Sequence, residues 1–216
     1  MCFDARTSAV AAVIGFASAW AAFSIQEHLL GIFIAVYALM QVAEFMIWRA
    51  LDAGSKVWNR RGTFLAASTL KLHALVVVGT LLALQWGKLK TRKSTRNALL
   101  ALFAAAIVVA VTAAPAPAST QPGCSKGCRL DWQFGASYSL QVLIIAAALF
   151  IGARRLFPSV AVFFSGAFFF AMLMSKVDPQ TTPKAAASTV WCLVVALFAP
   201  IIVGHLWWKS RKGKAS

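Results

Sequence analysis

Long apolar stretches, separated by short polar connections, make up most of the chain. Each stretch is close to the about 20 residues with which a helix crosses a hydrocarbon core of about 30 Å. The runs do not alternate between apolar and polar positions, and within a bilayer such runs form helices. The pattern therefore predicts an all-α fold, a polytopic transmembrane helical bundle of about seven spans. The spans are expected at residues 8–25, 29–51, 63–86, 97–114, 134–153, 159–175 and 190–208.

These spans are expected to form one domain, residues 1–208, followed by a basic tail at 209–216. The short connection at Gln26-Glu27-His28 predicts that the first two helices form an antiparallel hairpin. Only residues 154–158 divide the fifth and sixth stretches, and the proline at their end is typical of a helix kink. A six-span bundle therefore stays open as an alternative.

Composition agrees with a membrane protein and excludes a water-soluble domain. Hydrophobic residues make up 60% of the 216 positions and charged residues only 12%. The net charge of +15 would suggest nucleic acid as the partner of a soluble protein. Here the basic residues fall mostly between apolar runs, where they set orientation and meet anionic lipid headgroups. The bilayer is therefore the expected partner, and nucleic acid is not.

The distribution of basic residues predicts the orientation of the chain. Nine are spread over one side of a seven-span bundle, together with four aspartates, and the other side is richer. Because basic loops stay in the cytoplasm, the C-terminus is predicted to be cytoplasmic. The N-terminus and the Pro-rich loop 115–133 are predicted to be extracytoplasmic or lumenal. A cleaved signal peptide in the first span would reverse this arrangement and is disfavoured. The richer side contains Lys88, Lys90, Arg92, Lys93, Arg96, Arg154, Arg155, Lys209, Arg211, Lys212 and Lys214.

Charged and imidazole side chains inside the predicted spans are candidate functional residues, because lipid cannot solvate them. Gln41, Glu44 and Trp48 share one face of the second span with Tyr37. At 1.5 Å per residue, Glu44 and Lys71 of the third span reach nearly the same depth, which predicts an ion pair. His73 lies about 200° around the helix from Lys71 and needs another partner, whereas His205 is expected in the membrane interface. The pair is interpreted either as a lock on helix packing or as part of an ion pathway, with cofactor binding and catalysis as further alternatives.

The four cysteines fall on the extracytoplasmic side of the seven-span arrangement. Cys124 and Cys128 form a C-x3-C in a Gly-containing loop, and this spacing allows a disulfide or a metal clamp without specifying either. Cys2 and Cys192 complete the set, but a four-cysteine metal centre lacks the usual paired CxxC spacing. The zincin, phosphate-loop and dinucleotide-binding motifs are missing from the sequence. An enzyme is therefore not expected, and no cofactor is identified.

Two short segments resemble a family of multi-pass membrane proteins of unknown function, found in large DNA viruses of algae and protists and in bacteria. The first is Met1-Cys2-Phe3-Asp4-Ala5, where the bacterial members have Ser in place of Asp4. The second is the helix motif Met-Gln-x-x-Glu-x-x-x-Trp at residues 40–48, and a later Trp191-Cys192 pair is similar to one in the viral members. The resemblance implies importance for Cys2, Gln41, Glu44, Trp48 and Cys192, and it implies no activity.

The sequence thus predicts a membrane protein that binds or moves a small solute or ion through a cavity at Glu44. Lys71 would be the counter-ion, and the walls of the cavity would come from Gln41, Trp48 and Trp191. A structural or assembly protein, for example of a viral internal membrane, is the main alternative. A redox or cofactor-binding protein that uses Cys2 and Cys192 is the third. An oligomer is compatible with all three.

Overall fold

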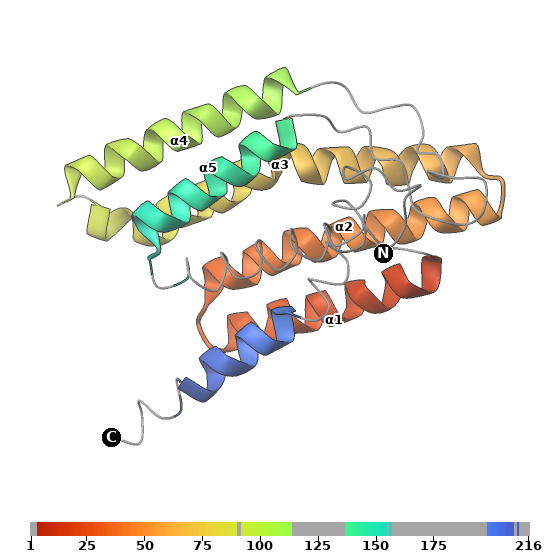
Figure 1. Ribbon diagram of the computed structural model, residues 1–216, viewed down its shortest axis with the longest axis horizontal. Coiled ribbons are helices and arrows are strands. Elements are labelled where there is room, and N and C mark those ends of the chain that lie inside the picture. Colours follow the sequence, from red (N-terminus) through yellow and green to blue (C-terminus); the bar gives the residue numbers. More distant parts are fainter. Residues whose placement is uncertain are drawn as a thin grey trace, which may run out of the picture.

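The computed structural model describes residues 4–89, 92–113, 137–154, 156, 198–209 and 211, and these residues form an all-α fold (Figure 1). A further helical segment covers residues 198–209. Four of the helices, Ala5–Ser24, His28–Asp52, Lys56–Leu89 and Lys93–Thr112, are long and apolar enough to cross a membrane. The predicted all-α fold is thus confirmed, and these four helices could span a membrane by their length and composition. The helices are α1 (Ala5–Ser24), α2 (His28–Asp52), α3 (Lys56–Leu89), α4 (Lys93–Thr112) and α5 (Ser137–Gly152).

The number of spans stays a prediction. The expected sixth span, 159–175, and the first part of the seventh lie outside the described residues. Helix α5 has 16 residues, or about 24 Å at 1.5 Å per residue, which is shorter than a hydrocarbon core of about 30 Å. The choice between six and seven spans therefore rests on the sequence pattern alone.

Local signals explain where α1 begins. The Asp4 side chain accepts a hydrogen bond of 2.7 Å from the backbone N–H of Thr7, so Asp4 is the N-cap of α1. The bond from the Thr7 backbone lowers the pKa of the Asp4 carboxyl, because it stabilises the ionised form. Asp4 therefore fixes the start of the helix.

Both turns around α2 contain a residue with positive φ. Gly54 adopts φ 63° directly after α2, where a residue without Cβ fits most easily. Gln26 adopts the same φ between α1 and α2, although it has a side chain. After Gly54, α3 starts at Lys56, seven residues before the predicted span, and the Ser55 hydroxyl accepts from the Trp58 N–H at 3.5 Å. The 34 residues of α3 therefore extend over about 51 Å.

The helices pack in a simple order. Helices α1, α2 and α3 are neighbours in sequence and in space, while α4 and α5 pack on α3 and on each other (Figure 1). Small residues at three- and four-residue spacing form the buried face of α1, as is typical where membrane helices approach closely. They are Ser8, Ala11, Ala12, Gly15, Ser18, Ala19 and Ala22.

Large apolar side chains cover much of the outer surface. Val13, in the middle of α1, is 69% exposed, and Leu72, in the middle of α3, is 45% exposed. Such exposure in the middle of long apolar helices is expected where side chains face lipid, because acyl chains are as apolar as the side chains. The described part of the chain is therefore shaped as an integral membrane bundle.

Candidate functional site

A line of buried polar and aromatic side chains follows one face of α2. Tyr37, Gln41, Glu44 and Trp48 are spaced by four, three and four residues, so they lie on the same side of the helix. All four are buried, and Glu44 is only 1% exposed. The eleven-residue separation of Tyr37 and Trp48 corresponds to about 17 Å along the helix axis. The face predicted from the sequence therefore points into the protein.

Helix α3 adds an imidazole to this face. His73 is 1% exposed, and its ring meets that of Tyr37 edge-on, with 4.4 Å between the ring centroids. Phe33 completes a three-ring cluster, with its ring centroid 5.7 Å from that of His73 and 5.0 Å from that of Tyr37. The Nε2 atom of His73 is buried and has no hydrogen-bond partner in the part of the chain that the structure describes. We call Tyr37, Gln41, Glu44, Trp48 and His73 the polar column.

Near the Trp48 end of the polar column, α2 and α3 approach each other closely at Gly62. A Cβ atom added to Gly62 would be 2.7 Å from Ile47 Cγ1 and 3.0 Å from the Ala43 carbonyl oxygen. One turn away, the buried Thr63 hydroxyl donates to Asn59 Oδ1 at 3.1 Å. The indole Nε1 of Trp48 is buried without a hydrogen-bond partner among the described residues. Both ends of the polar column thus contain a buried nitrogen of this kind.

The predicted ion pair between Glu44 and Lys71 is wrong. Lys71 Nζ instead donates to the carbonyl oxygen of Ala113, the C-cap residue of α4, at 3.3 Å. No ion pair joins the two residues in the described ranges. The reason is rotation about the axis of α3, because the face that presents His73 to α2 leaves Lys71 about 200° away. Equal depth in the membrane did not suffice to bring the charges together.

A contact between α3 and α5 was also not predicted. Gln141 of α5 is buried, and its side-chain oxygen accepts from the backbone N–H of Ala74, one residue beyond His73, at 3.3 Å. A glutamine in the apolar run of 134–153 was the available signal, because an amide in a membrane span usually finds a partner on another helix. Helices α2 and α5 therefore place polar groups on neighbouring parts of α3.

The other predicted site residues have different outcomes. His205 is exposed and its ring lies 6.3 Å from that of Trp208, and its position in the membrane interface stays a prediction. The remaining predicted residues lie outside the described ranges, so their roles stay predictions. These are Cys2, Cys124, Cys128, Trp191 and Cys192. Within the described ranges, no cluster of three or more His, Cys, Asp or Glu side chains could hold a metal ion.

Comparison with known proteins adds no assignment. No family model matches the chain, and neither a curated protein nor a solved structure shows significant similarity to it. The resemblance to the viral and bacterial membrane proteins therefore stays a prediction from its two short segments.

Proposed function

We propose that this multi-pass membrane protein binds a small polar solute or ion inside the bundle, at the polar column, and that Glu44 is its principal ligand. The observation that carries the proposal is the pair of buried nitrogens, His73 Nε2 and Trp48 Nε1, without hydrogen-bond partners in the described structure. Leaving a buried polar atom unsatisfied costs about 1–3 kcal/mol. Because the two nitrogens lie at opposite ends of a column about 17 Å long, one small occupant reaches only one of them. Polar species bound at more than one point along the column would supply both missing partners.

The chemistry of the polar column suits a small, polar occupant. The Trp48 indole is a donor only, the Glu44 carboxylate is an acceptor when ionised, and the Gln41 amide is both. An occupant therefore has to offer both kinds of group, or be a cation whose hydration shell does so. Lys71 has no part in this site, because its amine bonds to α4. Movement of the occupant across the membrane is the further step of the proposal, since charged groups inside membrane proteins commonly mark ion or proton routes.

Packing is the second candidate function of Glu44. Its 1% exposure and the close approach of α2 and α3 at Gly62 favour a residue that fixes how the helices meet. In that case the protein is a structural or assembly component of a membrane. The two candidates make opposite predictions for flux through the bilayer.

Ion flux into proteoliposomes distinguishes the two functions. The full chain would be reconstituted, and entry of H⁺, Na⁺ or K⁺ would be followed with dyes trapped inside the vesicles. The wild type should conduct one of these ions above protein-free vesicles, and Glu44→Gln should lower the rate about tenfold or more, equivalent to about 1.4 kcal/mol. Asp52→Asn is the matched control, since it removes a carboxylate from the exposed end of the same helix and should conduct like the wild type. Equal rates for wild type, Glu44→Gln and empty vesicles would favour the packing role.

A further inference from the structure

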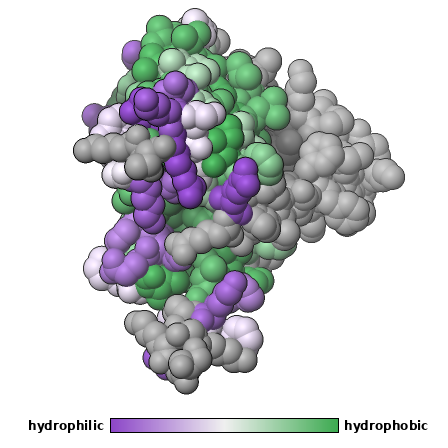
Figure 2. Space-filling model, turned by 90° about the vertical axis from the view of Figure 1, so that its left-hand side faces the viewer, coloured by the Kyte–Doolittle hydropathy of each residue, from purple (hydrophilic) through white to green (hydrophobic). Residues whose placement is uncertain are grey.

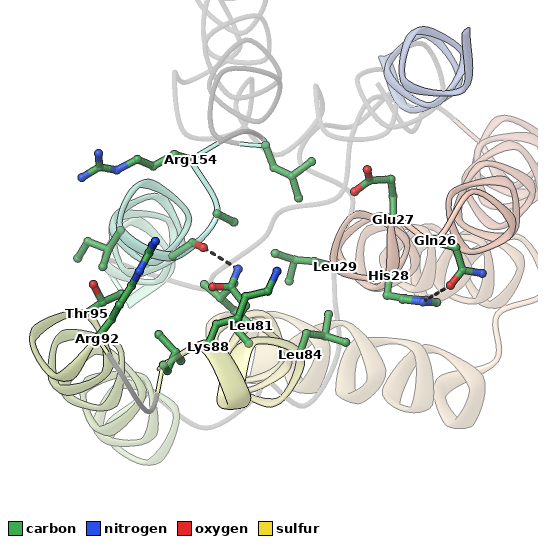
Figure 3. A pocket seen from close by; sticks show the side chains of 16 residues that line it. Gln26, Glu27, His28, Leu29, Leu81, Leu84, Lys88, Arg92, Thr95 and Arg154 are labelled. Atoms are coloured by element: carbon green, nitrogen blue, oxygen red, sulfur yellow. Dashed lines mark hydrogen bonds between the residues drawn. The ribbon is translucent and has the colours of Figure 1, made fainter. Parts of the chain in front are cut away.

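A pocket of about 850 Å³ opens at the opposite end of the bundle from Trp48, where α1 turns into α2, α3 turns into α4, and α5 ends (Figure 3). In the space-filling view of this end, hydrophilic side chains gather between apolar flanks (Figure 2). The predicted orientation places this end in the cytoplasm. We call this cavity the basic pocket.

Three cationic side chains from three parts of the chain line the basic pocket. Lys88 comes from the last turn of α3, Arg92 is the N-cap residue of α4, and Arg154 follows α5. The Arg154 guanidinium extends away from Lys88 (Figure 3) and lies 5.6 Å from the centroid of the Phe150 ring, an exposed residue outside the pocket lining. Glu27 also lines the pocket, but on the side of the α1–α2 turn (Figure 3). The cations outnumber this carboxylate, so the pocket favours an anion.

A hydroxyl and a helix start support the same preference. Thr95 lines the basic pocket, whereas the Nε2 atom of His28 lies 3.1 Å from the Gln26 side-chain oxygen and is engaged there. Helix α4 begins at this end without a side-chain cap and without an acidic residue in its first turn. Its first N–H groups carry partial positive charge, which favours an anion nearby. The start of α2 already has a carboxylate beside it, because Glu27 is its N-cap residue.

The floor of the basic pocket is apolar, which indicates what kind of anion it accepts. Leucines from two helices continue from the polar rim toward the bundle interior. Leu84 is 51% exposed and forms the accessible part of this surface, whereas Leu29, Leu81 and Leu89 behind it are buried. A soluble anion would gain nothing from such a surface, whereas the first acyl carbons of a lipid would pack on it. The apolar lining consists of Leu29, Leu81, Leu84, Leu89, Ile151, Ala153 and Leu156.

We propose that the basic pocket binds the phosphate headgroup of an anionic membrane lipid, with Lys88 and Arg92 as its ligands and the leucine floor beneath its first acyl carbons. Phosphate oxygens accept strong charge-assisted hydrogen bonds from such side chains. The pocket is separate from the polar column, so this proposal does not depend on solute binding at Glu44.

Another role for the same cations has to be separated from lipid binding. Gln85 Nε2 donates to the carbonyl oxygen of Gly152, the last residue of α5, at 2.6 Å. Cations near this helix end would stabilise its exposed carbonyl groups without any ligand. Lipid affinity and thermal stability must therefore be measured independently.

Native mass spectrometry of the full chain in detergent tests the proposal, with phosphatidylglycerol as the anionic probe and phosphatidylcholine as the neutral one. The wild type should prefer phosphatidylglycerol, and Lys88→Gln with Arg92→Gln should weaken its binding about tenfold or more. Lys93→Gln with Lys209→Gln is the matched control, because both residues are exposed, belong to the same end and lie outside the pocket. If the wild type shows no headgroup preference, or if the two double variants lose equal affinity, the proposal that the basic pocket binds the lipid is wrong.

A charge-preserving variant guards against misfolding as the cause of lost binding. Lys88→Arg with Arg92→Lys should retain most of the affinity and the melting temperature of the wild type. If it loses phosphatidylglycerol as fully as the glutamine variant while melting normally, positive charge in the pocket is not what binds the lipid, and the proposal is wrong.

Inorganic phosphate distinguishes a lipid from a soluble source of the same headgroup chemistry. At millimolar concentration it should not displace phosphatidylglycerol, because it lacks the acyl carbons that the leucine floor would contact. The opposite result has two parts: the wild type binds inorganic phosphate tightly and Lys88→Gln with Arg92→Gln abolishes this binding, while the same variant still binds phosphatidylglycerol normally. That result would assign the pocket to a soluble phosphate and contradict the proposal of lipid binding.

Discussion

The two halves of the α2–α3 pair are packed by different kinds of side chain. Near the α1–α2 turn, α2 and α3 share one large core of branched aliphatic residues, including Leu30, Ile34, Val78 and Leu81. Near the α2–α3 turn the buried apolar residues form only two small clusters, around Ala43 and around Ile47. Three buried polar residues, Gln41, Glu44 and Asn59, lie between these apolar residues along the chain.

This difference separates stability from specificity within one helix pair. Lipid gives little hydrophobic drive to helix association, so membrane helices are held by close packing and by inter-helix hydrogen bonds. The aliphatic half is held by close packing, and such a core can tolerate many volume-conserving exchanges. The polar half depends on one close approach at Gly62 and on satisfied polar groups, so single substitutions should have larger effects there.

Gly62→Ala should have the largest effect of the changes considered. The new Cβ would lie 2.7 Å from Ile47 Cγ1 and 3.0 Å from the Ala43 carbonyl oxygen, and backbone cannot move aside as a flexible side chain can. We expect a loss of about 2–3 kcal/mol, near the upper end of overpacking costs, measured by thermal unfolding in detergent. Gly87→Ala is the control, since no atom lies within 4 Å of its added Cβ, and better helix propensity should make it neutral or stabilising. If the two variants melt at similar temperatures, the close approach at Gly62 does not make the polar half more sensitive to substitution than the aliphatic half.

His73→Phe should stabilise the protein while impairing its function. Phenylalanine keeps the ring contacts with Tyr37 and Phe33 and removes the buried Nε2 atom that has no described partner. Relief of that unsatisfied group is expected to add about 1–2 kcal/mol to the free energy of unfolding. The ion flux that the wild type shows should fall in the same variant. His205→Phe, at an exposed position, should change stability by less than about 0.5 kcal/mol. A less stable His73→Phe protein would mean that the imidazole is a structural hydrogen-bonding group.

Gln26→Gly tests whether the aliphatic half tolerates local strain. Gln26 adopts φ 63° in the α1–α2 turn, a conformation that costs a residue with a Cβ about 1 kcal/mol relative to glycine. The substitution should therefore raise the free energy of unfolding by up to about that amount in the same melting assay. Gly54→Ala is the matched opposite, because Gly54 has the same φ and should lose about 1 kcal/mol. Two changes of the same sign would show that φ at these turns does not decide stability.

The sequence was informative about helices and their depth, for a physical reason. Long apolar runs are sufficient to define membrane helices, so α1, α2 and α4 lie close to their predicted ranges. The earlier start of α3 at Lys56 was missed because hydropathy marks the membrane boundary, whereas a helix continues until a residue such as Gly54 ends it.

Rotation of the helices was harder to predict than depth. The position of Glu44 on a buried face followed from the spacing of polar residues along α2. The partner of Lys71 did not, because it depends on which side of α3 meets α2. That choice is made by the close approach at Gly62 and by the shape of the neighbouring side chains, and one sequence contains no direct record of either. The same limit explains why the contact between His73 and Tyr37 was not foreseen.

The smallest expected effect is the coupling between Glu44 and Lys71. Because Lys71 bonds to Ala113, the losses in Glu44→Gln and Lys71→Met should add in the double variant to within about 0.5 kcal/mol. Asn59 and Thr63 provide a matched coupled pair, since their side chains are joined by a buried bond of 3.1 Å. For Asn59→Leu and Thr63→Val the coupling should exceed about 0.5 kcal/mol. A coupling of about 1 kcal/mol or more between Glu44 and Lys71, measured beside this pair in the same detergent, would restore the ion pair and return Lys71 to the polar half of the bundle as the counter-ion of Glu44.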